Sequence, residues 1–245
     1  MKKILLTLAA LALSAAAFAQ DIDFEDLGDL NTIEISKAGS RVKTELNLAF
    51  PMYFGWTALT NANAKGEWAR ISGNWPNEFD ARKNFMYGLQ LADLRIRYNM
   101  LDVSLGLRWT FMDFTLSNSA MTLRKGSDGV WWPKSIQDEA LNYDGKKSKI
   151  HASYFGVPLR VGVDLGKVML YAGGSIELRT NGYTKYKKPK YRQDAKDLFN
   201  PIRATVEGGF TYGGLGIFVM YGLTPLFQES LSDARTLTFG LTLGM

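Results

Sequence analysis

Hydrophobic and polar residues alternate along most of the chain beyond about residue 40. In LDVSLGLRWTF (101–111), the odd positions hold Val103, Leu105, Leu107 and Trp109, and the even positions hold mostly small or charged residues. A period of two is the period of a β-strand, because successive side chains point to opposite faces. The pattern predicts eight strands, with approximate spans 41–55, 83–98, 101–116, 150–164, 167–180, 201–213, 215–225 and 234–245.

The predicted strands are long, and their connections alternate between long and short. Several strands have 12 or more residues, whereas a strand of a soluble protein typically has about 5–6 and a tilted strand that crosses a bilayer needs about 9–11. The long connections are 57–82, 117–149, 181–200 and 226–233, and the tight turns fall at Asn99–Met100, Leu165–Gly166 and Gly213–Gly214. This alternation predicts an all-β fold: an eight-stranded antiparallel up-and-down transmembrane β-barrel over residues 41–245, with long extracellular loops and short periplasmic turns.

Two segments depart from the simple alternation. Leu89 and Leu91 share parity with the charged residues Asp93 and Arg95, so a β-bulge near 91–92 is expected. Pro158 lies inside a predicted strand, where it removes one ladder hydrogen bond. We expect a bulge or another local irregularity there as well.

The polar faces of the strands carry charges of both signs. In a closed lumen each charge needs a partner, because an unpaired buried charge costs several kcal/mol. A soluble sandwich with a mixed charged surface would show the same alternation, and the strand lengths and the loop alternation favour the lumen. The predicted lumen network contains Lys43, Glu45, Asp93, Arg95, Arg97, Arg108, Arg160, Asp164, Glu177, Arg179, Arg203 and Glu207.

Aromatic residues are found near both ends of the apolar faces. Tyr98 and Tyr212 lie at short-turn ends, and Trp109, Phe111 and Phe155 lie toward long-loop ends. Two aromatic belts are typical of a barrel in a bilayer, although aromatic residues also favour strands in general. The last segment, RTLTFGLTLGM, needs no polar protection if it pairs with the first strand and its apolar face contacts lipid.

The N-terminus predicts export. Lys2 and Lys3 precede an apolar segment that ends at Ala17-Phe18-Ala19, which indicates a secretory signal peptide over 1–19 rather than a membrane anchor. The acidic, polar residues 20–40 are expected to form a loose periplasmic segment.

Composition excludes several protein classes. The chain has no cysteine, so disulfides and a lipoprotein anchor are excluded. The net charge of +5 includes the two lysines of the signal peptide, and without them 27 basic residues face 24 acidic ones. This balance gives no sign of a nucleic-acid partner. No stretch of 18 apolar residues follows the signal peptide, so no transmembrane helix is expected.

The segment YFGVPLRVGVDLGKVMLYAGGSIELRTNG (154–182) resembles the PorT-like outer-membrane β-barrel family of Bacteroidetes. The resemblance is carried by an aromatic-proline strand motif, a tight turn and a glycine pair, at Tyr154, Phe155, Val157, Pro158, Leu159, Gly173 and Gly174. It implies a location in the cell outer membrane, biogenesis through the barrel assembly machinery, and a possible place in a secretion complex. The family shares a fold, not one activity. Many outer-membrane barrels end on Phe, which the assembly machinery reads, whereas this sequence ends on Gly244-Met245.

Candidate chemistry is sparse. His151 is the only histidine, and with Ser153 it forms an H-x-S motif similar to the His/Ser pair of eight-stranded lipid A deacylases. Such a site needs a carboxylate to orient the histidine, and the nearest strand carboxylate, Glu177, is expected in the lumen. The prediction is therefore a non-enzyme, with lipid A deacylase-like chemistry as the alternative. No motif indicates a cofactor or a metal.

Two features of the long loops suggest binding. The segment YTKYKKPKYRQD (183–194) interleaves tyrosines with cations, and such a patch could contact lipopolysaccharide phosphates or an acidic glycan, or simply be solvated; its cations are Lys185, Lys187, Lys188, Lys190 and Arg192. Tryptophans also fall in or beside the long loops, as binding residues or as loop packing; they are Trp56, Trp68, Trp75, Trp131 and Trp132.

An eight-stranded lumen is filled by side chains, so no porin activity is expected. The sequence favours a structural or adhesive outer-membrane barrel that contacts outer-membrane lipids and lipopolysaccharide, with its long loops open to an extracellular ligand or a secretion partner. A lipid A-modifying barrel, an accessory barrel of a secretion complex and a soluble periplasmic β-protein remain the alternatives.

Overall fold

The computed structural model describes residues 32–34, 42–48, 50–61, 63–71, 79–136, 147–187 and 191–244. The predicted signal peptide lies outside these residues, as do Trp75, Lys188 and Lys190.

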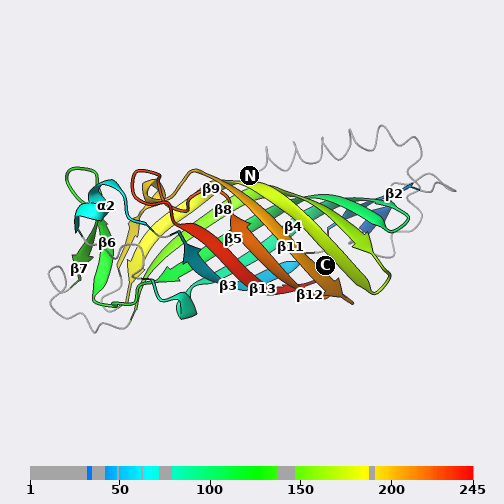
Figure 1. Cartoon of the computed structure of the whole chain (residues 1–245), viewed down its shortest axis with the longest axis horizontal. Helices are drawn as coiled ribbons and strands as arrows, with labels where there is room; N and C mark the ends of the chain where they lie inside the picture. Colours follow the sequence, from blue (N-terminus) through cyan, green and yellow to red (C-terminus); the bar gives the residue numbers. More distant parts are fainter. Residues whose placement is uncertain are drawn as a thin grey trace.

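Within the described residues, eight antiparallel strands close into a barrel (Figure 1). They are β3 (Met52–Thr60), β4 (Phe85–Tyr98), β5 (Leu101–Thr115), β8 (Ser148–Asp164), β9 (Val168–Tyr186), β11 (Ile202–Tyr212), β12 (Leu215–Gly222) and β13 (Arg235–Leu243). Each strand pairs with the next in this order, and β13 pairs with β3, which closes the sheet. The predicted eight-stranded up-and-down barrel is confirmed.

Shorter strands and helical turns lie at the two ends of the barrel. At the short-turn end, β1 (Thr32–Glu34) pairs with β2 (Val42–Asn47), which pairs with β4. Three residues of the predicted loose segment 20–40 are thus in a strand. At the long-loop end lie the β6–β7 hairpin (Met121–Lys125 and Trp131–Ser135), β10 (Tyr191–Asp194), α2 (Gly66–Ile71) and the 3-10 turns η1 (Ala81–Lys83) and η2 (Lys196–Leu198).

The first predicted strand, 41–55, is wrong in its bounds. The structure has two strands there, β2 and β3, which pair with different halves of β4. Pro51 lies in the break, and its carbonyl accepts the backbone N–H of Gln90 at 3.0 Å. Proline has no N–H to donate to a ladder, so the strand is interrupted where the proline occurs.

Residues with positive φ form the predicted tight turns. Asn99 has φ 54°, and Gly213 and Gly214 have φ 57° and 85°. These are the left-handed conformations that tight hairpins of this kind require. The turn at 165–167 is one residue longer than predicted, and Gly166 in it has φ 89°.

The bulge expected near 91–92 is confirmed, because the β4–β5 register shifts between Gln90 and Ala92. The irregularity expected at Pro158 is confirmed on the β5 side, where the β5–β8 ladder lacks the pairs of Gly106 with Pro158 and of Leu107 with Val157. On the β9 side Pro158 pairs with Ser175 without a shift, and a separate register shift lies at Ser153/Tyr154. Gly106 faces Pro158, where an added Cβ would lie 3.2 Å from the ring, so a missing side chain makes room for the proline.

Polarity is inverted across most of the wall. Its outward side chains are large and apolar and remain exposed, as Leu159 (52%), Ile176 (66%) and Phe239 (52%) show, whereas its inward arginines and glutamates are buried. In water an exposed apolar band of this size would be a liability. The pattern is the one that a barrel surrounded by lipid requires.

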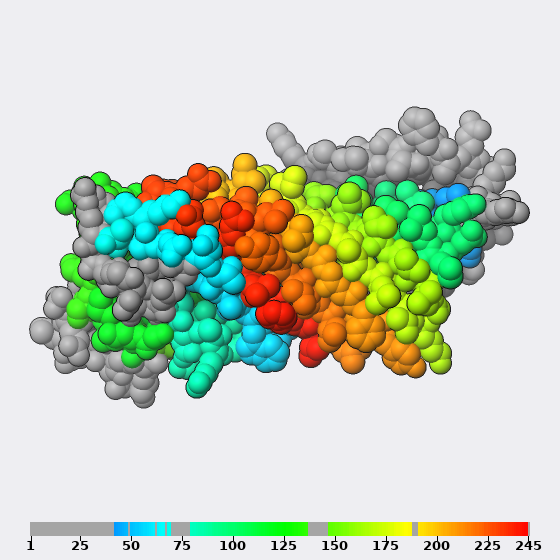
Figure 2. Space-filling model, in the orientation of Figure 1, coloured from blue at the N-terminus to red at the C-terminus, as the bar shows by residue number. Residues whose placement is uncertain are grey.

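The long-loop end has an ordinary hydrophobic core, which we call the cap core. Figure 2 shows segments from distant parts of the chain meeting at this end, at the left of the view. The side chains of the cap core are fully or almost fully buried; they are Trp68, Phe79, Phe114, Leu116, Leu123, Trp131, Ile150, Leu198, Phe199, Leu226, Phe227 and Leu231.

Strand β8 passes through both environments. In its second half, Val157 and Leu159 point outward and are exposed, while Arg160 is buried inside. In its first half, Ile150 is buried inside, and Lys149 belongs to the outer face. The apolar face therefore changes sides close to the Ser153/Tyr154 register shift, which marks the level where lipid would end.

Candidate functional site

The lumen holds a compact ion-pair network from four strands. Arg203 Nη1 donates to Glu177 Oε2 at 2.7 Å, and Arg108 Nη2 donates to Glu177 Oε1 at 3.3 Å. Glu207 accepts hydrogen bonds from both Arg108 and Arg160. Because each carboxylate bridges two guanidinium groups, the three arginines and two glutamates cross-link the four neighbouring strands β5, β8, β9 and β11 inside the lumen.

Neutral polar groups extend this network. Ser175 Oγ accepts a hydrogen bond from Arg108 at 3.1 Å, and Gln90 Oε1 accepts from Arg160 at 2.7 Å and from the Tyr53 hydroxyl at 3.0 Å. The side chains of Arg108 and Glu177 are 1% and 0% exposed. Solvent therefore does not reach the middle of the lumen, and a buried ionic network of this kind holds the wall in one arrangement.

A second group of charges lies nearer the short turns. Arg95 pairs with Asp93 at 3.1 Å and Arg97 pairs with Asp102 at 3.0 Å. Arg97 also approaches the half-buried Glu45 at 3.6 Å. Asp102 is a buried member that the predicted network omitted, although its parity in 101–111 placed it on the polar face.

Three residues of the predicted network lie outside these buried clusters, and their assignment to it is corrected. Lys43 is exposed on β2. Asp164 accepts the backbone N–H of Gly166 at 2.9 Å and caps a turn. Arg179 is half-buried beside the β8–β9 register shift and donates to the carbonyl of Phe199. Parity alone could not separate these rim positions from the enclosed ones, because depth along the barrel is decided by strand register.

His151 lies on the outer face of β8, among aromatic residues. Its Nδ1 is 2.6 Å from Asp113 Oδ1 on β5, and its ring stacks on Tyr183 of β9 with centroids 4.5 Å apart. Phe111 lies beside it at 6.3 Å and stacks on Tyr87 at 5.0 Å. The aromatic row therefore continues across β4, β5, β8 and β9 at the level where the apolar face changes sides.

The H-x-S pair has a carboxylate that sequence reasoning missed. Asp113, not Glu177, orients His151; it continues the outward parity of Trp109 and Phe111, which was the available signal. The Ser153 hydroxyl is 2.8 Å from the Thr180 hydroxyl, a partner without basic character. The structure thus assembles the histidine–carboxylate pair and directs the serine elsewhere.

The predicted basic loop is largely regular strand. Lys185 lies on β9 opposite Arg192 on β10, and Lys187 follows β9 directly. The guanidinium of Arg192 stacks 3.8 Å above the Tyr183 ring. Asp194 of β10 accepts the backbone N–H of Lys196, the first residue of η2, and this hydrogen bond lowers the pKa of its carboxyl below the ordinary value.

The tryptophans are distributed between packing and the outer wall. Trp68 is fully buried and donates its indole N–H to the carbonyl of Trp131 at 2.7 Å, and Trp131 is 3% exposed. These two pack the loops together rather than offer a binding surface. Trp132 is half-buried, with its indole N–H on Asp128. Trp56 belongs to β3 and is 50% exposed on the wall.

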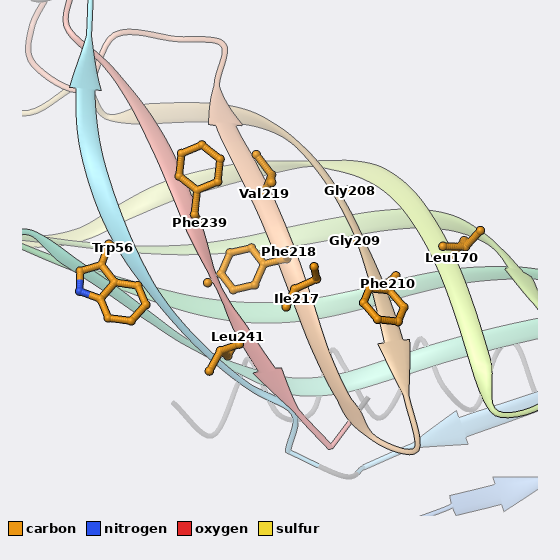
Figure 3. Close-up of a pocket in the computed structure, with 11 residues that line it drawn as sticks. Trp56, Leu170, Gly208, Gly209, Phe210, Ile217, Phe218, Val219, Phe239 and Leu241 are labelled. Atoms are coloured by element: carbon orange, nitrogen blue, oxygen red, sulfur yellow. The ribbon is translucent and has the colours of Figure 1, made fainter.

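An apolar depression of about 510 Å³ lies on the outer wall (Figure 3). Gly208, which has no side chain, lies between the outward residues Leu170 and Val219, and Phe239 and Leu241 form the far side. Its lining is almost wholly apolar. Such a surface can hold an acyl chain but offers no group that could carry out chemistry.

Within the described ranges, no group of three or more His, Asp or Glu residues is placed to hold a metal ion. None of the helices in that part of the chain has the length and the apolar character needed to cross a membrane.

No protein-family model matches the chain, and no curated protein is similar to it. Among solved structures, the Neisserial surface protein A (NspA) matches with a TM-score of 0.34 and 10% identity, over 84% of this chain and 98% of that one. This likeness is too distant to carry an argument, so function has to be inferred from the geometry above.

Proposed function

We propose that the protein is an outer-membrane β-barrel with a closed, ion-paired lumen, exported by a signal peptide and acting as a structural or surface-binding barrel through its long-loop end. The inverted polarity of the wall carries the proposal. Leu159 and Ile176 are more than half exposed, while Arg108 and Glu177 are enclosed. A soluble β-protein gains stability by the opposite arrangement.

The cap core supports a working surface at the long-loop end. It ties α2, the β6–β7 hairpin and the 226–234 connection into one folded unit, so an extracellular ligand or an adhesion partner would meet an ordered surface. A rigid platform binds with a smaller entropic cost than free loops. The PorT resemblance keeps a place in a secretion complex as a narrower version of this role.

Fractionation and reconstitution test the proposal. We expect the mature chain in the outer membrane, a gel mobility that changes on heating, and negligible conductance in planar bilayers because the lumen is filled. A chain that is recovered in the soluble periplasmic fraction without detergent would contradict it. Replacing Arg108 and Glu177 together by serine provides a positive control, since a partly emptied lumen should conduct more than the native one.

A lipid A-modifying activity is the second candidate, and one observation favours it: the 2.6 Å contact between His151 and Asp113. Activity would require the Ser153 hydroxyl to leave Thr180 and turn to His151. Lipid A incubated with the reconstituted protein should then lose an acyl chain, and His151→Ala should abolish the loss. Unchanged lipid A with both proteins would remove this candidate and leave the structural role in place.

A further inference from the structure

Four lysines form a two-by-two array on the outer face where β8 and β9 leave the apolar band. Lys149 of β8 is directly opposite Lys185 of β9. Lys147 and Lys187 extend the same register, and the backbone N–H of Lys187 donates to the carbonyl of Lys147 at 3.3 Å. We call this set the lysine array; with Tyr186 it lines a depression of about 170 Å³.

The array works against the stability of the sheet. Like charges directly opposite each other on neighbouring strands repel and destabilise the pair. Arg192, opposite Lys185 on β10, adds a further positive charge to the same face. A protein that maintains such a cluster can recover the free energy when an anion binds between the cations.

Nearby carboxylates do not neutralise the array. Lys149 pairs with Asp113 at 3.2 Å, and Asp113 is also engaged by His151. In the part of the chain that the structure describes, Lys147, Lys185 and Lys187 form no ion pair with a carboxylate. Among the described residues, the site therefore keeps an excess of positive charge even after Asp113 is counted.

The position of the lysine array at the edge of the apolar wall indicates which ligand it binds. Directly below it lie the aromatic rings of Phe111, His151 and Tyr183, and below these the exposed apolar wall. An aromatic row of this kind lies at the membrane interface, so the lysines come at headgroup level. Ammonium groups bind phosphate as point charges, and basic pockets at this level bind phosphorylated lipid headgroups.

We propose that the lysine array, with Arg192, binds the phosphorylated headgroup of a lipid in the outer leaflet, whose acyl chains lie along the apolar wall below. This inference rests on the proposed membrane location. It assigns the lipid-anchoring role to cations on or directly beside β8, β9 and β10, two of which, Lys147 and Lys149, precede the predicted basic loop.

Native mass spectrometry of the folded, detergent-solubilised protein tests the site with defined probes. Lipid A carrying its phosphates should bind, and the same lipid A after phosphatase treatment should bind about tenfold more weakly or not at all. Competition with inorganic phosphate distinguishes a lipid headgroup from free phosphate as the ligand. At millimolar concentration, inorganic phosphate should not displace lipid A from a lipid site. Full displacement by inorganic phosphate, or equal binding of both lipids, would overturn the inference.

A matched pair of double variants locates the site. Lys185→Gln with Lys187→Gln removes two charges from the array, and Lys43→Gln with Lys167→Gln removes two exposed charges at the short-turn end. We expect the first pair to weaken binding of phosphorylated lipid A about 10- to 30-fold and the second to change it less than about twofold. Equal effects of the two pairs would contradict the assignment.

Stability separates a binding site from a structural one. Because the array is self-repelling, the Lys185→Gln, Lys187→Gln protein should unfold in lipid-free detergent at a urea concentration equal to or above that of the native protein. A marked decrease would mean that these lysines support the fold. If the native barrel enters membranes but binds both lipid A forms alike, this inference fails while the proposed function stands.

Discussion

At the level of Ile150 and Phe114 the interior of the barrel is packed with apolar side chains, whereas at the level of Arg108 and Glu177 the same strands enclose ion pairs. Both levels are buried to the same degree. They differ in what lies outside the wall: beside the cap core the outward residues of β5, β8 and β9 are polar, such as Asp113, Lys149 and Lys185, and beside the ion pairs they are mostly large and apolar.

The comparison shows that burial alone does not decide which side chains belong inside this protein. Above the aromatic row, water surrounds the wall in the proposed orientation, and an apolar interior gains the usual hydrophobic free energy. Below it, lipid takes the apolar face, and the alternating strand turns its polar face inward. The lumen is stable because each charge has a partner there, as enclosed charges require.

The largest loss of stability is expected when one member of the lumen ion pairs is removed. Glu177→Gln leaves Arg108 and Arg203 with one neutral acceptor in place of a shared carboxylate. Removing one partner of a buried ion pair costs about 3–5 kcal/mol of the free energy of unfolding. Urea unfolding in detergent, followed by heat-dependent gel mobility, measures it. Glu45→Gln is the control, and an equally small loss in both would show that the lumen pairs contribute little.

The cap core should lose stability when one of its large side chains is shortened. Phe227 is fully buried, contacts Trp68 edge-on at a centroid distance of 5.2 Å, and stacks with Phe79 and Phe199 at 6.0 and 5.8 Å. Phe227→Ala is expected to cost about 3–4 kcal/mol through the cavity that it leaves. Limited proteolysis should then cut the long-loop end while the spanning strands stay protected.

Phe239→Ala is the matched control for the cap core, since Phe239 is 52% exposed on the wall. Lipid can fill the space that the ring leaves, so we expect less than about 1 kcal/mol. Equal losses in the two variants would argue that the cap core is not a separate packed unit.

Along β8 the outer face changes from apolar to polar. Replacing an apolar outward residue by a charged one, and a charged outward residue by an apolar one, tests where this change occurs. Leu159→Lys places an ammonium group on the apolar band and should cost about 2–4 kcal/mol in a bilayer. Lys149→Leu, on the same face above the aromatic row, should cost less than about 1 kcal/mol. Refolding into lipid vesicles measures both. A tolerated Leu159→Lys would place that position in water and move the proposed boundary.

The smallest effect is expected at a glycine of the outer wall. An added Cβ at Gly208 would have only an ordinary contact, 3.5 Å from the carbonyl of Tyr171, whereas at the inward Gly240 it would collide with the carbonyl of Phe54. Gly208→Ala should therefore be neutral or stabilise the barrel by up to about 1 kcal/mol. Gly240→Ala should destabilise it clearly. Thermal unfolding of the two variants measures the difference. A larger loss of stability for Gly208→Ala than for Gly240→Ala would place Gly208 inside the barrel.

By itself, the sequence determined the architecture of this protein. A period of two over long segments, and loops that alternate with tight turns, predicted the eight strands and their order, because side-chain alternation and turn chemistry are local properties of a chain. The bulge near Leu91 was predictable for the same reason: Leu89 and Asp93 share parity, and one extra residue reconciles them.

Only the tertiary structure decided which residues meet. The pairs Arg203–Glu177, Asp113–His151 and Lys149–Lys185 join different strands, and their contact depends on register and depth along the barrel, which parity does not encode. The strand break at Pro51 and the packing of Trp68 against Trp131 depend in the same way on partners distant in the chain. The local pattern decides which face a side chain takes, and closure of the barrel decides its neighbours.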